Sequence, residues 1–211
     1  MILILYGKPG AGKGTQAKLL ENDYGFIHIS TGDIIREVIQ NKEEGFDELN
    51  KYVSKGLLVP DEVVAKLLIN KLNTIKVEKI ILDGFPRNLN QYNILIELLK
   101  DKKDHIKNIY ITSDDEIIKK RILGRRICPS CGNIFNIYKI GEIKECPVCG
   151  STLIQRDDDT LEVLNKRMGE YLKSTKPLVD FLKKNGNLIE IDGNYDDLRL
   201  IEKNIVKKLG L

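Results

Sequence analysis

Short apolar runs alternate with amphipathic segments along the chain. The apolar runs, rich in Ile, Leu and Val, are residues 2–6, 27–29, 79–83, 106–111 and 187–191. Apolar residues at helical spacing occupy the segments between them, at 13–23, 61–73, 88–101, 114–124, 160–184 and 195–209. Strands this apolar are typical of a parallel sheet that helices cover on both faces. The pattern therefore predicts an α/β fold with a five-stranded parallel sheet.

Two segments interrupt this alternation. Residues 30–59 predict a helical insert, and residues 125–159 combine turn signals, short apolar stretches and all four cysteines. Each segment is too short to be an independent domain, so we interpret both as flaps on the α/β core. The core then comprises residues 1–29, 60–124 and 160–211.

Charge and hydropathy exclude several classes of protein. The chain has 34 Lys and Arg against 31 Asp and Glu, a balance that does not favour nucleic-acid binding. No apolar run approaches the length of a membrane span, and the run MILILY is too short for a signal peptide. We expect a cytoplasmic protein that binds neither membranes nor nucleic acid.

Residues 7–13 match the phosphate-loop pattern G-x-x-x-x-G-K, between a predicted strand and a predicted helix as this motif requires. Its glycines let backbone N–H groups face a phosphate, the helix N-terminus adds a favourable dipole, and Lys13 adds a positive charge. Position 14 is Gly where the common motif has a magnesium-binding Ser or Thr, so Thr15 or water would take that role. The loop predicts binding of a nucleoside triphosphate.

The cysteines form two Cys-x-x-Cys pairs, Cys128 with Cys131 and Cys146 with Cys149. The 14 residues between the pairs are close to the spacing of zinc ribbons. Four thiolates would give a closed tetrahedral site, which indicates structural rather than catalytic zinc. A redox pair or disulfides are the less favoured alternative.

Five separated motifs resemble those of adenylate kinases, at matching spacings over essentially the whole chain. They are GKPGAGKGTQ (7–16), ISTGDIIRE (29–37), LDGFPRNLNQ (82–91), RILGRR (121–126) and RDDD (156–159). The resemblance implies a monomer that reversibly transfers the γ-phosphoryl group of Mg-ATP to AMP, giving two ADP. It also implies that residues 30–59 are an AMP-binding flap. Residues 125–159 resemble the zinc-bearing lid of many bacterial members.

The resemblance implies that six arginines contact phosphate groups, a task that suits the planar guanidinium. The implied catalytic residues are Lys13, Asp83, Arg87, Arg121, Arg125, Arg156 and Arg167. Asp83 follows a strand and would hold magnesium through water, although it could instead cap the turn after it. Asp33 is a weaker candidate for the same water network. Asp157 and Asp158 would lie beside the closing lid or form a solvated hinge.

The resemblance also implies which residues line the two nucleotide pockets. The ATP pocket would comprise Gly10, Ala11, Gly12, Lys13, Gly14, Thr15, Arg121, Arg125, Ile134, Phe135 and Tyr195. The AMP pocket would comprise Thr31, Arg36, Leu57, Leu58, Val59, Gly84, Phe85, Pro86, Arg87, Gln91, Arg156 and Arg167. Phe135 stands where the family usually has Tyr, and we expect its ring to keep the adenine contact. Tyr195 replaces the usual Lys or Gln, so contact there would run through the backbone.

Two alternatives differ in the substrate or the class of protein. A UMP/CMP-type kinase would use the same chemistry, but Thr31 and Gln91 favour AMP because Gln offers adenine both a donor and an acceptor. A nucleic-acid-binding ATPase with a zinc ribbon would need a basic knuckle, whereas residues 128–149 carry two Lys against two Glu. His28 is interpreted as a core or edge residue of its strand.

Overall fold

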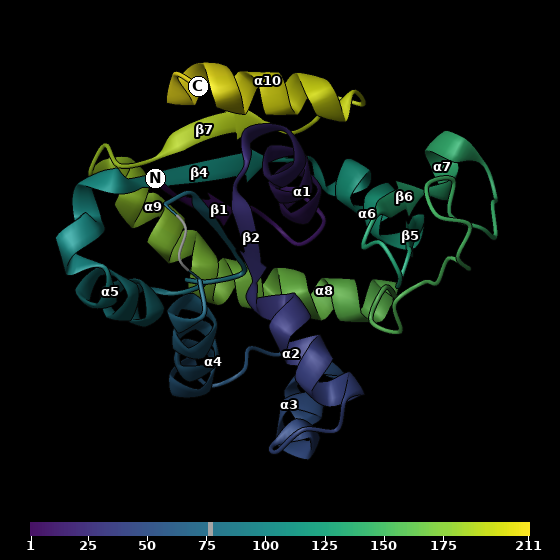
Figure 1. Cartoon of the computed structure of the whole chain (residues 1–211), viewed down its shortest axis with the longest axis horizontal. Helices are drawn as coiled ribbons and strands as arrows, with labels where there is room; N and C mark the ends of the chain where they lie inside the picture. Colours follow the sequence, from purple (N-terminus) through teal and green to yellow (C-terminus); the bar gives the residue numbers. More distant parts are fainter. Residues whose placement is uncertain (76–77) are drawn as a thin grey trace.

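Five parallel strands form the central sheet within the residues that the computed structural model describes, 1–75 and 78–211 (Figure 1). In spatial order they are β2 (Ile27–Ser30), β3 (Ile80–Asp83), β1 (Ile2–Tyr6), β4 (Ile106–Thr112) and β7 (Ile189–Asp192). Every residue of the central strand β1 is buried, which explains its uninterrupted apolar sequence. The predicted α/β fold with a parallel sheet is confirmed.

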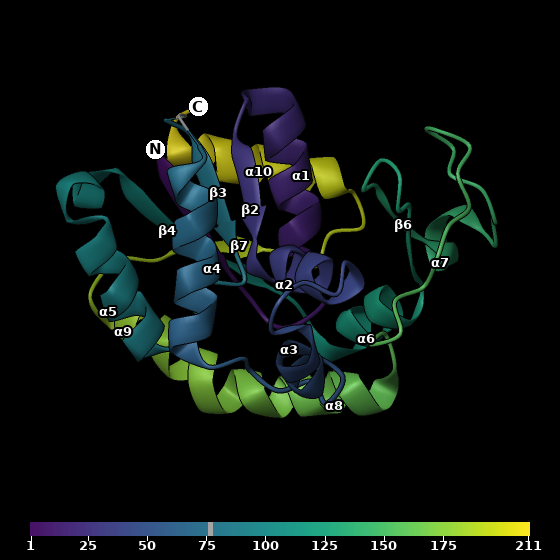
Figure 2. The same ribbon diagram turned by 60° about the horizontal axis from the view of Figure 1, so that its bottom comes forward.

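Helices cover both faces of this sheet (Figures 1 and 2). One face carries α1 (Lys13–Tyr24) and α10 (Leu198–Leu209), and the other carries α4 (Asp61–Asn73), α5 (Leu89–Leu98) and α9 (Lys176–Lys184). Alternate residues of β1 pack on opposite faces of the sheet. Leu3 and Leu5 pack with α1 and α10, and Ile2 and Ile4 pack with α4, α5 and α9. Within the described residues, no helix has both the length and the apolar character that a membrane span requires.

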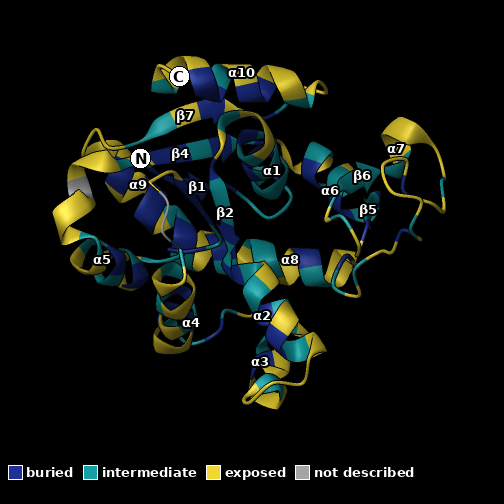
Figure 3. Cartoon of the chain, viewed as in Figure 1, coloured by how far each residue is buried: buried dark blue, intermediate teal, exposed yellow. Residues whose placement is uncertain are grey.

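The two interrupting segments project from the core. Residues 30–59 contain α2 (Thr31–Gln40) and α3 (Phe46–Val53), and residues 125–159 contain the antiparallel pair β5 (Arg125–Ile127) and β6 (Ile134–Asn136). Figure 3 shows that buried residues concentrate in the sheet and its covering helices, whereas most residues of the projecting segments are exposed or intermediate.

A short helix, α7 (Ile137–Ile140), lies in the second projecting segment, where the sequence predicted only β-type structure. Asn136 explains it, because its side-chain oxygen accepts from the N–H of Tyr138 and caps α7. The amide of Asn136 also donates to the carbonyl oxygens of Lys120 and Arg121, at the end of α6 (Asp115–Leu123). One side chain therefore ends α6 and starts α7.

The predicted helix over 160–184 is interrupted. It consists of α8 (Leu161–Glu170), a π-helical turn η2 (Tyr171–Thr175) and α9. Pro177 has no N–H and cannot continue an α-helical ladder, and the N–H of Lys176 bonds instead to the carbonyl of Tyr171, five residues back. Similarly, the segment predicted as helical over 88–101 is α5 followed by a 3₁₀ segment, η1 (Lys100–His105).

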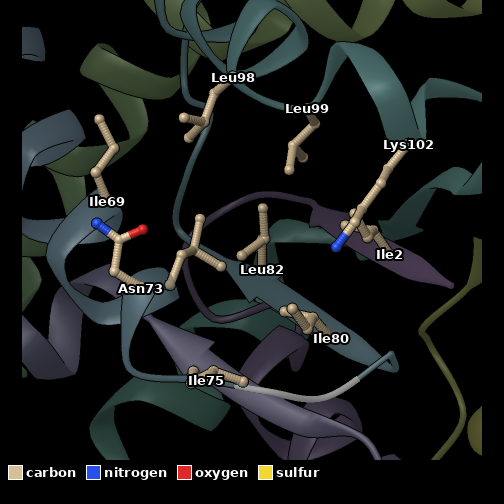
Figure 4. Close-up of a pocket in the computed structure, with 10 residues that line it drawn as sticks. Ile2, Ile69, Asn73, Ile75, Ile80, Leu82, Leu98, Leu99 and Lys102 are labelled. Carbon is tan, nitrogen blue, oxygen red and sulfur yellow. The ribbon is translucent and has the colours of Figure 1, made fainter.

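An apolar cavity of about 170 Å³ lies between α4, α5 and the sheet (Figure 4). Ile2 and Ile80, the first residues of β1 and β3, line it together with Leu72 and Leu99. Ligands of parallel α/β sheets bind at the carboxyl ends of the strands, so this cavity at the amino ends is not the nucleotide site.

Candidate active site

The phosphate loop joins the carboxyl end of β1 to the first turn of α1. Gly12 takes a left-handed conformation (φ 98°) that glycine adopts without strain, and α1 begins at the next residue. The backbone N–H groups of this first turn favour a bound anion. Lys13 Nζ donates to the carbonyl oxygens of Gly7 (2.9 Å) and Lys8 (3.1 Å). The loop therefore holds its lysine where P-loops bind phosphate oxygens.

Lys13 is half-buried among charged groups, and the loss of solvent around it lowers the pKa of its ammonium group to about 8. Asp83 opposes this shift, whereas three guanidinium groups reinforce it. These belong to Arg87, Arg167 and Arg125. A bound anion would stabilise the charged lysine and raise its pKa again.

Asp83 ends β3 beside the phosphate loop, because β3 pairs in register with β1. Burial would raise the pKa of Asp83, but the imidazole of His28 and the charge of Lys13 outweigh it and hold the pKa below its ordinary value. His28 Nε2 lies 3.5 Å from Asp83 Oδ2, at the limit of hydrogen bonding, so His28 borders the site. A Cβ on Gly14 would lie 3.3 Å from the same oxygen, so glycine keeps the space beside the carboxylate open.

Arginine side chains gather around this site, and their charges help to lower the pKa of two of them, Arg87 and Arg156. Burial lowers the pKa of Arg87, and the charges of Arg167 and Arg36 lower it further. Burial likewise lowers the pKa of Arg156 to about 10, with added effects from Arg36 and Arg125. Like charges this close are unfavourable unless an anion binds between them, so the cluster indicates a site for a polyanion.

Carboxylates from the motif RDDD hold two of these arginines. Arg125 donates from Nε to Asp159 Oδ2 (2.7 Å) and from Nη2 to Asp159 Oδ1. Asp159 is only 1% exposed. Arg167 pairs with Asp158, whereas Asp157 is exposed. Two acidic residues of this run therefore orient arginines, and one faces solvent.

Asp33, from the first turn of α2, pairs with two more arginines. It accepts a hydrogen bond from Arg36 and lies 3.5 Å from Nη2 of Arg156. Asp33 was expected only as a weak candidate for a magnesium water network. In the structure its carboxylate joins α2 to Arg156, the arginine that precedes the three aspartates.

Arg121, in the last turn of α6, bridges the phosphate loop, Ser113 after β4 and the segment after β7. Its Nη1 donates to the carbonyl of Ala11 (3.3 Å) and to Ser113 Oγ (3.0 Å). Its Nη2 donates to the carbonyls of Gly193 (2.8 Å) and Tyr195 (3.2 Å). The backbone of Tyr195 thus lies beside the phosphate loop, while Ile134 and Phe135 lie half-buried in β6.

Thr31 and Gln91, expected to contact the base, are both buried. The hydroxyl of Thr31 lies 3.4 Å from the carbonyl oxygen of Asp83. Gln91, 2% exposed, accepts the backbone N–H of Arg87 at Oε1 (2.7 Å) and donates from Nε2 to Asp61 (2.7 Å).

Other residues expected at the AMP site come from the segments 57–59 and 84–86. Gly84 is required next to Thr31, because a Cβ there would lie 2.8 Å from the threonine hydroxyl. Val59 and Phe85 are buried, whereas Leu57 is 44% exposed. The apolar residues expected in the AMP pocket therefore differ in their exposure.

The four cysteine sulfurs of the second projecting segment lie within 4.8 Å of one another. The Sγ atoms of Cys128 and Cys149 are 3.3 Å apart, and those of Cys131 and Cys146 are 3.6 Å apart. Sulfurs about 2.3 Å from a tetrahedral zinc ion would be roughly 3.8 Å from one another. The donor set and its spacing are therefore compatible with zinc.

Both halves of this cluster have the same backbone geometry. In each, the N–H of the glycine after the second cysteine bonds to the carbonyl of the first: Gly132 to Cys128 (3.0 Å) and Gly150 to Cys146 (2.9 Å). Both glycines have positive φ, at 70° and 75°. The repeated turn brings each pair of thiols to the same side of the chain.

Comparisons with known proteins agree with this geometry. The family model described as adenylate kinase matches residues 5–187. The chain belongs to the adenylate kinase family. It is 43% identical over 210 residues to an adenylate kinase of Borreliella burgdorferi, covering 98% of this chain and 97% of that protein. An adenylate kinase of Caldicellulosiruptor saccharolyticus is 42% identical over 217 residues, with 100% of both chains covered.

The enzyme is a nucleoside monophosphate kinase that transfers a phosphoryl group from ATP to AMP and so acts in adenine nucleotide homeostasis. Enzymes of this family bind ATP, AMP and ADP and use Mg²⁺ with ATP. The five motifs therefore predicted the family and the reaction correctly.

Sequence reasoning missed two carboxylates of this enzyme. Asp159 was noted only as part of a charge run, and such runs are usually solvated. Asp61 is the first residue of the predicted helical segment 61–73, a position that favours acidic residues in any helix. The sequence contains no local signal that separates the buried Asp159 from the exposed Asp157.

Proposed function

We propose that phosphoryl transfer takes place between the phosphate loop and the arginine cluster, where the two nucleotides meet end to end. ATP would bind along the loop and AMP beneath the flap. The ATP phosphates would contact Lys13, Arg121 and Arg125, the AMP phosphate Arg36 and Arg87, and the group in transit Arg156 and Arg167. The observation that carries this proposal is the cluster of cationic side chains around the phosphate loop, where burial and neighbouring positive charges lower the pKa of Lys13, Arg87 and Arg156. Anionic oxygens between these groups would relieve their repulsion.

Little covalent chemistry is needed from the side chains. AMP phosphate is already an anionic nucleophile, so the protein must hold two anions in line, neutralise their charge and exclude water. The carboxylates of Asp33, Asp158 and Asp159 contribute by orienting the arginines before substrate arrives. This preorganisation reduces the ordering that the transition state would otherwise require.

Asp83 would hold magnesium through water. Its carboxylate is ionised, as the lowered pKa implies, and Gly14 leaves space beside it for a hydrated ion. When bound, magnesium would neutralise charge on the β- and γ-phosphates. Within this chain, Asp83 would orient the ion's water ligands. Thr15 follows Gly14, the position where the common motif has its magnesium-binding hydroxyl, so it is the residue that could supply one.

We infer that the enzyme comprises a core of residues 1–29, 60–124 and 160–211, an AMP-binding flap of residues 30–59 and a lid of residues 125–159. The adenine of ATP would contact Ile134, Phe135 and the backbone of Tyr195. AMP would contact Thr31, Gln91, residues 57–59 and residues 84–86. The four cysteines would bind structural zinc in the lid, since four thiolates leave no open position for catalysis. We expect a cytoplasmic monomer, in keeping with the reduced thiols that zinc requires.

The proposed roles can be tested by steady-state kinetics in a coupled assay for ADP. ATP is paired in turn with AMP, CMP, UMP and GMP, and we expect a strong preference for AMP. Arg36→Ala should then raise KM for AMP at least tenfold and leave KM for ATP nearly unchanged. Arg199→Ala is the control, because Arg199 pairs with Asp23 and Glu202 on α1 and α10. Preference for a pyrimidine monophosphate would contradict the pocket, and unchanged AMP kinetics in Arg36→Ala would contradict the phosphate assignment.

A further inference from the structure

We propose that Asp61 is a positioning residue that fixes the orientation of the Gln91 amide and thereby sets the enzyme's preference between 6-aminopurine and 6-oxopurine monophosphates. The proposal rests on the assignment of Gln91 to the base of AMP made above. Asp61 itself is not proposed to touch either nucleotide.

Asp61 is the acceptor at the centre of an amide network. It is the first residue of α4, two positions after Val59 at the end of the flap segment. Its carboxylate accepts Nε2 of Gln91 (2.7 Å), Nδ2 of Asn88 (2.9 Å) and Nδ2 of Asn90 (2.8 Å). All three donors lie at the start of α5, where Asn88 is the N-cap and Asn90 and Gln91 belong to the first turn. The network therefore joins the start of α4, just after the flap segment, to the residue proposed to contact the base.

The charge of Asp61 restricts the amide of Gln91 to one orientation. Burial opposes ionisation, but the hydrogen bonds from Asn90, Asn88 and Gln91 outweigh it and lower the pKa of Asp61. An ionised carboxylate only accepts hydrogen bonds, so the nitrogen end of the Gln91 amide must face it. The backbone N–H of Arg87 only donates, so the oxygen end must face Arg87. A rotation of the amide by 180° would break both bonds at once.

The fixed orientation matters because 6-aminopurines and 6-oxopurines present opposite patterns of hydrogen-bond donors and acceptors at N1 and position 6. With one N–H given to Asp61 and one lone pair given to Arg87, the amide has one N–H and one lone pair left. Adenine offers an acceptor at N1 and a donor at its 6-amino group, whereas a 6-oxopurine offers a donor at N1 and an acceptor at O6. An amide free to rotate could pair with either pattern. An amide held at both ends pairs with only one of them.

The backbone supports the same orientation. Asn88 caps α5, and its Oδ1 accepts the N–H of Gln91 (2.8 Å) while its Nδ2 donates to Asp61. The main chain and side chain of Gln91 are therefore both fixed to this network. Asn90 donates to Asp61 as well but is exposed and makes no contact with Gln91 among the hydrogen bonds of the described residues. This difference makes Asn90 a matched control.

The test compares kcat/KM for AMP, for IMP and for purine riboside 5′-monophosphate, which lacks the 6-amino group, at saturating Mg-ATP. The variants are Asp61→Asn, Asn90→Ala, Gln91→Met and the double variant Asp61→Asn with Gln91→Met. KM for ATP and thermal melting are measured for each. Asp61→Asn removes the acceptor-only partner and keeps the shape, so the ratio of AMP to IMP should fall about tenfold, the size expected for one lost charged hydrogen bond. KM for ATP should stay unchanged, and Asn90→Ala should keep the ratio.

Comparing Asp61→Asn in the wild-type enzyme and in the Gln91→Met variant distinguishes an effect that acts through Gln91 from a general disturbance of the structure. Gln91→Met alone should lower the ratio of AMP to IMP, and adding Asp61→Asn should then change it no further. An unchanged ratio in Asp61→Asn, or the same fall with and without Gln91, would overturn the role of Asp61 while leaving the AMP pocket intact. An unchanged ratio in Gln91→Met would overturn both this inference and the assignment of Gln91.

Discussion

Binding of ATP should draw a proton from solution, because Lys13 is only partly protonated in the free enzyme at mildly alkaline pH. Its pKa is about 8 when no anion is bound. Phosphate oxygens that restore an ordinary lysine pKa of about 10.4 would make the bound state almost fully protonated up to pH 9. Uptake should then be about 0.1 proton per ATP at pH 7, about 0.5 at pH 8 and about 0.9 at pH 9.

The sign of the effect on affinity follows from the same linkage. The bound state holds more protons than the free state between the two pKa values, so the affinity for ATP should fall as pH rises through 8. Above pH 8 the fall should approach tenfold per pH unit, since each pKa unit corresponds to about 1.4 kcal/mol. Below pH 7 the affinity should hardly depend on this lysine.

Calorimetry measures this uptake directly. Mg-ATP is titrated into the enzyme without AMP, in three buffers of different ionisation enthalpy, and the slope of the observed enthalpy gives the number of protons. The matched control is Lys18→Met, which removes a half-exposed lysine of the same helix that pairs with Glu21. Zero uptake at pH 9, or an equal uptake in Lys13→Met, would refute the reasoning about Lys13.

Three other predictions concern the loop, the lid and the buried acid. Lys13→Met should abolish activity with an unchanged circular dichroism spectrum, and an active variant would contradict its role. Chelation of the metal at the cysteines should lower the melting temperature, with activity partly kept at low temperature; an identical melting curve after verified metal removal would argue against structural zinc. Asp159→Ala should cost about 3 kcal/mol in denaturant unfolding by leaving Arg125 without its partner, whereas Asp157→Ala should cost almost nothing.

Much of the core was predictable because its signals are local. Strand β1 is predicted by a run of five apolar residues, and the phosphate loop by its glycines and Lys13 between strand and helix. The helical segment 61–73, predicted from its apolar spacing, has the same bounds as α4. These features depend on neighbours within a few positions, so a single sequence is enough to predict them.

The missed features depend on residues far apart in the chain. The π-helical turn could have been suspected from Pro177, yet the apolar spacing across 160–184 gave a single helix. The burial of Asp159 depends on Arg125, 34 positions earlier, and the role of Asp61 depends on Gln91, 30 positions later. One sequence does not reveal such pairs, because their spacing follows from the tertiary fold.

The bond between Arg125 and Asp159 joins the first and last residues of the lid segment. When the two ends of an insertion are held together, changes of length or sequence between them are tolerated, because they do not alter the distance between the points where the chain leaves and re-enters the core. Length and composition in such a segment can vary while the entry and exit points stay fixed. The proposed lid should therefore tolerate exchange of its interior, residues 126–155, for the metal-free lid of another kinase, provided that Arg125, Arg156, Asp158 and Asp159 are kept and the graft supplies its own contact to adenine.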